Sequence, residues 1–155
     1  MHPTATTPSS ALPGQRKIDR LLAHYGDSHQ NPRNELIHFI AIPLIMLSLV
    51  GMLFALHPWV AYAFVAASMV YYARLSGVFL VAMALWSLVT FGLVFAMGER
   101  VLPISIGIFV GAWVMQFIGH KIERKKPSFF EDVQYLWVGP LFVLSKLFGP
   151  LGIRW

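Results

Sequence analysis

Leu36 to Leu56 reads LIHFIAIPLIMLSLVGMLFAL, and this stretch decides the fold class. Its 21 residues are almost all apolar, and about 20 such residues in a helix cross the ~30 Å hydrocarbon core of a bilayer. Asn31-Pro32 precedes the stretch, an arrangement that caps and begins a helix, and His57-Pro58 ends it. We therefore predict a transmembrane helix here.

The composition of the chain supports the same class. Of the 155 residues, 57% are hydrophobic and only 12% are charged, whereas an average soluble domain has about 25% charged residues. A soluble domain could not cover so much apolar surface with so few charges. We predict an all-α, polytopic integral membrane bundle with four or five transmembrane or re-entrant helices. Residues 1–15, rich in Pro, Ser and Thr, are expected to be a disordered tail, and residues 16–155 a single membrane domain.

Several more segments have the pattern of membrane helices. The apolar ones are residues 59–73, 77–97, 101–119 and 133–149, and residues 16–25 form a short amphipathic helix expected on the membrane surface. The first apolar segment is short for a span, but Trp59 and Tyr71-Tyr72 at its ends are typical interfacial anchors. The last one is interrupted by Gly139-Pro140. It is therefore predicted to be a kinked span, a re-entrant segment or a helix packed at the interface.

The basic residues predict the topology. One group precedes the first span and another follows the fourth: Arg16, Lys17, Arg20 and Arg33, then Lys121, Arg124, Lys125 and Lys126. With four spans both groups, and Arg74, face one compartment, as the positive-inside rule requires. If residues 59–73 did not cross, the two groups would face opposite compartments. We therefore expect them to cross, with the basic face cytosolic in a bacterial inner membrane, or at the endoplasmic reticulum of a eukaryote.

Some functional classes are excluded at this point. The chain has no cysteine, so disulfides, thiolate metal sites and cysteine nucleophiles are absent. The net charge of +5 comes from residues flanking apolar runs, without the aromatic and basic interleaving of nucleic-acid surfaces, so we expect no nucleic-acid partner. Membrane lipid is the expected surrounding. A transporter is disfavoured because no charged residue lies in the middle of an apolar run.

The histidines are the candidate functional residues. Of six, four fall at the predicted cytosolic ends of the first and fourth spans: His24, His29, His38 and His120. An ionisable group at such a boundary is a candidate site. Because Asn31-Pro32 separates His29 from the helix that carries His38, a loop can fold back, and the imidazoles of His29, His38 and His120 could converge. Alternatively, interfacial histidines only bond lipid headgroups or backbone carbonyls.

Two strings of the sequence resemble a known family. They are YGDSHQNPRNELIH at residues 25–38, running into Ile42-Pro43-Leu44, and QFIGHKIERKKPSFF at residues 116–130, followed by Gly139-Pro140. Together they resemble the membrane family of fungal 2-hydroxy fatty acid dioxygenases acting in phytosphingosine breakdown, and its bacterial relatives. The resemblance implies an Fe(II)-dependent enzyme that uses O2 to shorten a 2-hydroxy fatty acid by one carbon, the α-oxidation step.

The resemblance also implies a set of site residues. His29, His38 and His120 match the family's histidines as Fe(II) ligands, and Tyr25, Asn34 and Glu123 match companion polar positions in the catalytic site. Three neutral imidazoles suit Fe(II) and leave octahedral positions for the carboxylate and hydroxyl of a 2-hydroxy acid and for O2. Glu123 could be a fourth ligand, a base for the 2-hydroxyl or an acceptor that orients His120, and we favour the last role.

Two other functions compete with the dioxygenase. In the first, the protein binds haem, with His38 and His120 as axial ligands. In the second, it is a non-catalytic multi-pass membrane protein whose histidines only pack.

If the protein is the dioxygenase, the acyl chain of its substrate is expected beside Phe39, Trp113 and Phe117.

Overall fold

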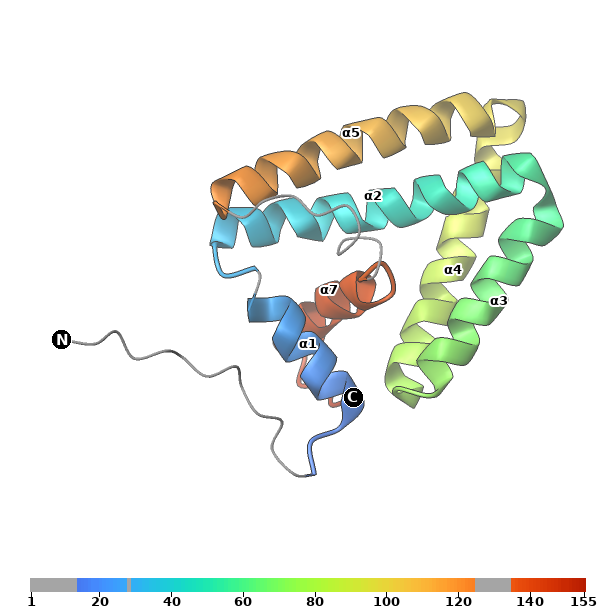
Figure 1. Ribbon diagram of the computed structural model, residues 1–155. Coiled ribbons are helices and arrows are strands. Elements are labelled where there is room, and N and C mark those ends of the chain that lie inside the picture. The colour runs from blue at the N-terminus through green and yellow to red at the C-terminus, as the bar shows by residue number, and fades with distance from the viewer. Residues whose placement is uncertain (1–13, 28, 125–134) are drawn as a thin grey trace.

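The computed structural model describes residues 14–27, 29–124 and 135–155, and in these ranges the chain is helical without any strand (Figure 1). The elements are α1 (Lys17–Asp27), α2 (Pro32–Leu56), α3 (Pro58–Ala73), α4 (Gly77–Met97), the 3₁₀ turn η1 (Gly98–Arg100), α5 (Val101–Ile122) and α7 (Val138–Phe148). The predicted all-α class is therefore confirmed. Most of the predicted tail, residues 1–13, and the loop residues 125–134 lie outside the described residues.

The two ends of α2 follow from local sequence. At its start the side chain of Asn31 accepts the N–H of Arg33 at 3.0 Å, and Pro32 occupies the first turn, where a missing N–H costs nothing. At its end His57 is extended, with φ −167° and ψ 133°, as the following proline favours. The Nδ1 atom of His57 also accepts the N–H of Trp59 at 3.3 Å and so caps α3.

Helices α2 and α5 form the longest pairing in the fold and lie side by side in Figure 1. Two glycines allow the close approach. A Cβ atom on Gly51 of α2 would overlap the hydroxyl of Ser105, and one on Gly119 of α5 would overlap Oδ1 of Asn34. Small residues at crossings let helix backbones pack closely, which is a major source of affinity between helices in lipid. The pairing therefore holds the start of α2 against the end of α5.

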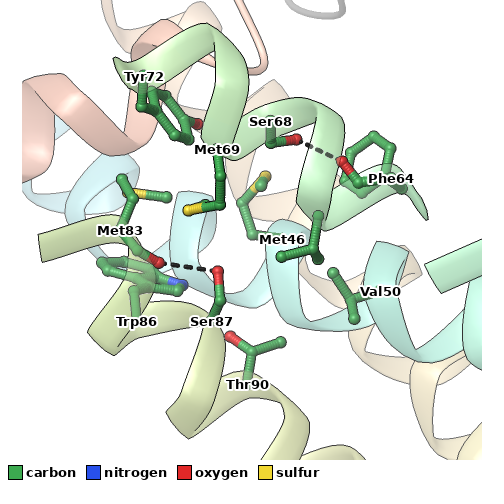
Figure 2. Close-up of a pocket in the computed structure, with 11 residues that line it drawn as sticks. Met46, Val50, Phe64, Ser68, Met69, Tyr72, Met83, Trp86, Ser87 and Thr90 are labelled. Carbon is green, nitrogen blue, oxygen red and sulfur yellow. Dashed lines mark hydrogen bonds between the residues drawn. The ribbon is translucent and has the colours of Figure 1, made fainter. Parts of the chain in front are cut away.

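The α3–α4 hairpin runs at a steep angle to this pair in Figure 1. Where it meets α2, Met46, Met69 and Met83 pack around a cavity of about 20 Å³, which is room for roughly one water. Figure 2 shows that the hydroxyls of Ser68 and Ser87 bond carbonyls of their own helices there, at 2.8 Å each. This cavity is a packing defect of the core and too small for an acyl chain.

Helix α7 lies inside the fold, where every residue from Val138 to Leu144 is buried. It has 11 residues and is about 16 Å long, too short to cross a bilayer. Pro140 does not break it, because N–H groups in the first helical turn have no intrahelical acceptor to lose. Of the three forms predicted for residues 133–149, the short buried helix fits a re-entrant or packed segment better than a kinked span, and the form itself stays a prediction.

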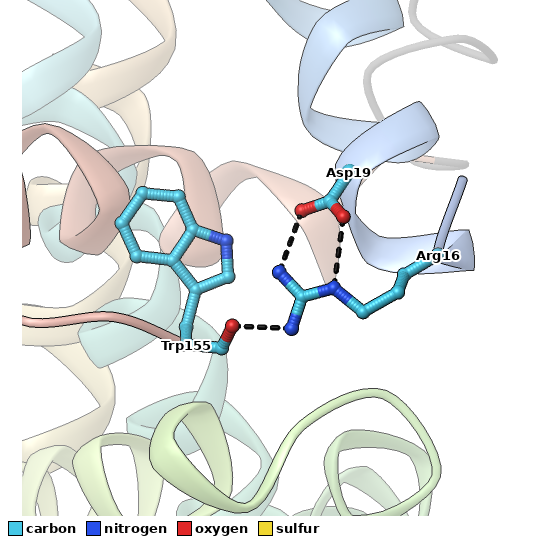
Figure 3. A network of polar contacts seen from close by, with 3 residues as sticks. All are labelled: Arg16, Asp19 and Trp155. Carbon is cyan, nitrogen blue, oxygen red and sulfur yellow. Dashed lines mark hydrogen bonds and ion pairs between the residues drawn. The ribbon is translucent and has the colours of Figure 1, made fainter. Parts of the chain in front are cut away.

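Helix α1 covers α7. Its apolar face, expected to rest on the membrane surface, packs against α7 through buried Ile18, Leu22 and Tyr25. Figure 3 shows a further tie: Arg16 pairs with Asp19 at 2.9 and 3.0 Å and also donates to the backbone carbonyl of Trp155. Because these polar groups are partly exposed, buried apolar contact accounts for most of the stability of the packing between α1 and α7.

Among the described residues, two helical segments are long and apolar enough to cross a membrane, Pro32–Leu56 and Gly77–Ile122, and the second contains α4, η1 and α5. Gly98, with φ +56°, begins the turn between α4 and α5 in a conformation that favours glycine. Large apolar side chains such as Leu88 and Val114 are exposed on α4 and α5, as expected for a surface in contact with lipid. The number of spans stays a prediction.

Candidate metal centre

The candidate site lies where the α1–α2 loop, the start of α2 and the end of α5 meet. His29 comes from the loop, His38 from the second turn of α2 and His120 from the last turns of α5. The ring centroids of His29 and His38 are 4.1 Å apart, those of His38 and His120 5.6 Å, and those of His29 and His120 6.5 Å. The structure thus brings together the three histidines singled out in the sequence.

His29 and His38 face each other through their Nε2 atoms, which are 2.9 Å apart. Each Nδ1 lies against a backbone carbonyl, that of Tyr25 for His29 at 2.8 Å and that of Asn34 for His38 at 2.9 Å. A carbonyl oxygen only accepts, so both Nδ1 atoms carry hydrogen and donate. In two neutral rings, both Nε2 atoms then present lone pairs to each other.

Two lone pairs at this distance repel each other unless a proton or a cation lies near both. Nitrogen ligands about 2.1 Å from a metal and at right angles to each other are about 3.0 Å apart. The 2.9 Å separation between the Nε2 atoms of His29 and His38 matches this distance between adjacent nitrogen ligands. Backbone carbonyls on the opposite ring nitrogens are also the usual outer partners of metal-bound histidines. The donor set therefore fits a divalent metal.

The ring of His120 lies farther from the rings of His29 and His38 than these two lie from each other. It is half-buried, whereas His29 is 7% exposed and His38 1%. Within the described ranges, no three His, Asp or Glu side chains are already close enough together to hold a metal ion. A three-histidine site therefore requires the ring of His120 to approach the other two, and its role as a ligand stays a prediction.

Glu123 connects the end of α5 to the start of α2. Its carboxylate accepts the N–H of Gln30 at 3.0 Å, the N–H of Asn31 at 3.2 Å and the side-chain N–H of Asn34 at 3.0 Å. A carboxylate at a helix N-terminus is favoured by the unpaired N–H groups and the helix dipole. Glu123 thus holds both segments that carry His29 and His38. Whether it also orients His120 stays a prediction.

Tyr25 forms one wall of the site. Its ring stacks on that of His29 with centroids 4.3 Å apart and planes 14° apart, and it is only 8% exposed. Because the carbonyl of Tyr25 also accepts from His29, the residue fixes that imidazole both by its backbone and by its ring. This positioning role was not predicted from the sequence, where Tyr25 was only a companion polar residue.

An apolar cavity of about 240 Å³ is lined by Tyr25 and by residues of α2 and α5. Its lining is Tyr25, Ile42, Ile45, Leu49, Phe109, Trp113, Gln116, Tyr135, Leu136 and Gly139. Of the three aromatic residues expected beside an acyl chain, Trp113 lines the cavity. Phe39 packs against the core instead, and Phe117 is 48% exposed.

The other histidines lie elsewhere. His24 is exposed and lies beside the ring of Tyr135, with centroids 5.7 Å apart, and His57 caps α3. His2 lies outside the described residues. The structure thus places His24 and His57 apart from His29, His38 and His120, and the division of the histidines into metal ligands and others stays a prediction.

A family model described as 2-hydroxy-palmitic acid dioxygenase Mpo1-like matches residues 15–151. The chain belongs to the Mpo1-like family. A curated relative, 2-hydroxy-palmitic acid dioxygenase MPO1 of Saccharomyces cerevisiae, is 28% identical over 138 residues, which cover 84% of this chain and 79% of the relative. No solved structure matches the chain. The Mpo1-like match includes His29, His38 and His120, so the family resemblance of the two strings is confirmed.

Proposed function

We propose that this protein is an Fe(II)-dependent dioxygenase that shortens 2-hydroxy fatty acids by one carbon. The observation that carries the proposal is the pair of Nε2 atoms of His29 and His38, which are 2.9 Å apart. Tyr25, which stacks on His29, also lines an apolar cavity. The name of the yeast relative, a 2-hydroxy-palmitic acid dioxygenase, supports the substrate class and the reaction.

His29, His38 and His120 would hold the iron. Iron bound there would supply the redox and Lewis-acid chemistry that O2 requires. The bonds from Nδ1 of His29 and His38 to backbone carbonyls fix the tautomers in which Nε2 carries the lone pair that would bind the metal. Stacking by Tyr25 holds His29, and the bonds of Glu123 hold Gln30 and Asn31, so two of the three ligands would be positioned before substrate arrives.

The cavity between α2 and α5 would bind the acyl chain. Ile45, Leu49 and Phe109 provide an apolar lining, while Tyr25 and Gln116 mark its polar end near the histidines. A fatty acid in this orientation would place its carboxylate and C2 hydroxyl toward His29 and His38. The site would lie at the cytosolic face of a multi-pass bundle, so that a lipid substrate could enter from the bilayer.

The geometry disfavours the haem alternative. An axial histidine must present its Nε2 atom to the haem iron, but Nε2 of His38 faces Nε2 of His29 at 2.9 Å. A porphyrin between His38 and His120 would have to displace His29 from this position. Purified protein without a Soret band would confirm that haem is absent.

Metal analysis tests the proposed centre. Protein purified without oxygen should contain close to one iron per chain, and His38→Ala should lose it. His57→Ala is the matched control, because His57 caps α3 away from the site and should keep the iron. Equal iron content in wild type, His38→Ala and His57→Ala would refute the assignment and favour a non-catalytic protein whose histidines only pack.

A further inference from the structure

Gln116 is a buried polar residue that the proposed iron site does not use. It lies on α5, is 5% exposed and lines the apolar cavity. Its Oε1 atom is buried and has no hydrogen-bond partner among the residues that the structure describes. Burying an acceptor without a donor costs free energy, so such an atom in a binding cavity indicates a partner supplied by the ligand.

The position of Gln116 relates this atom to the chemistry. It precedes His120 by four residues, which puts both on one face of α5, about 6 Å apart along the helix axis. Toward Leu49 and Phe109 the cavity is apolar and suits methylene groups. Gln116 therefore lies between the histidines and the acyl-chain part of the cavity, where the first carbons of a fatty acid would be.

An acceptor without a partner requires a donor. The carboxylate of a fatty acid only accepts hydrogen bonds, and its methylene groups do neither. The hydroxyl on C2 is the one donor that distinguishes a 2-hydroxy acid from an ordinary fatty acid. We propose that Oε1 of Gln116 accepts a hydrogen bond from this hydroxyl and so makes the site select 2-hydroxy acids. The identity of the ligand in this inference rests on the proposed function.

Selectivity follows from the same bond. A fatty acid without the hydroxyl fills the apolar cavity equally well but leaves Oε1 without a donor. Sites built to bond a hydroxyl reject the analogue that lacks it, because a buried polar group is then left unpaired. Gln116 is thus a specificity-determining residue, whereas His29, His38 and His120 are common to any substrate of the centre.

The test compares the binding of 2-hydroxypalmitate and palmitate to the purified full chain by calorimetry without oxygen, so that no turnover occurs. Wild type should bind 2-hydroxypalmitate more tightly. Gln116→Leu should reduce the preference about tenfold, the size of one hydrogen bond, with palmitate affinity kept or increased. Ser105→Ala is the matched control: its hydroxyl is buried on α5, without a partner among the described residues, and does not line the cavity.

An unchanged preference in Gln116→Leu would overturn the inference. Equal weakening of both ligands would also overturn it, because Gln116 would then bond the carboxyl group that they share. Retained palmitate binding shows that the variant folds, and Gln116→Met provides a second apolar replacement. If oxygen gave no shortened product but Gln116→Leu still lost the preference, the dioxygenase proposal would fail and the hydroxyl recognition would stand.

Discussion

Replacement of Glu123 should destabilise the protein even when no metal is bound. Its carboxylate accepts three hydrogen bonds, from the backbone N–H groups of Gln30 and Asn31 and the side chain of Asn34. At about 0.5–1.5 kcal/mol for each bond, Glu123→Ala should cost about 1.5–4.5 kcal/mol. The lower half of that range is expected, since Glu123 is only half-buried and water can replace part of what is lost.

Glu123→Gln is the more informative change. Its one remaining oxygen can replace part of the carboxylate, but its amide NH₂ would face at least one of the N–H donors. Glu123→Gln should therefore lose most of the stability lost in Glu123→Ala. An exposed carboxylate behaves differently, and Glu99→Gln in the turn between α4 and α5 should change stability by about 0.5 kcal/mol or less.

The assay is denaturation of metal-free protein in mixed micelles, followed by circular dichroism. Wild type, Glu123→Ala, Glu123→Gln and Glu99→Gln would be compared before and after iron is added. If both Glu123 variants unfold like wild type without metal and differ only in iron affinity, Glu123 acts at the metal. The proposed connection between α5 and the start of α2 would then be refuted.

Three further predictions concern packing, topology and the cavity. Gly119→Ala should lower stability by about 1–3 kcal/mol because its Cβ would overlap Asn34, whereas Gly107→Ala, with open space around it, should be neutral; unfolding measurements would decide. Cysteines introduced at Gln15 and Ser128 should both be labelled from the cytosolic side, and labelling from opposite sides would contradict the topology. Leu49→Trp should shorten the cavity and shift binding toward shorter 2-hydroxy acids, and an unchanged preference would place the acyl chain elsewhere.

Local patterns in the sequence predicted much of the fold. The apolar run with Asn31-Pro32 before it predicted α2, because capping and hydrophobic length depend on neighbouring residues. Residues 133–149 were harder to interpret. Their composition is equally apolar whether the segment crosses a bilayer or packs inside a bundle, and only the packing of α1 and α2 around α7 distinguishes these cases.

The site shows the same contrast. His29, His38 and His120 could be grouped because the loop before Asn31-Pro32 and the ends of two predicted helices were expected on the same membrane face. The bonds from Glu123 to the start of α2 join residues 89 to 93 positions apart, and no periodicity encodes such a pairing. Gln116 lies in an apolar helix, and its proposed role in binding could be recognised only from the cavity that it lines.

The central claim is tested most directly by the mass of the product formed from 2-hydroxypalmitate. Iron-loaded protein given this acid and O2 in detergent should yield a fatty acid one carbon shorter, with none formed by His38→Ala under the same conditions. Recovery of unchanged 2-hydroxypalmitate from protein with a full complement of iron would contradict the proposed function.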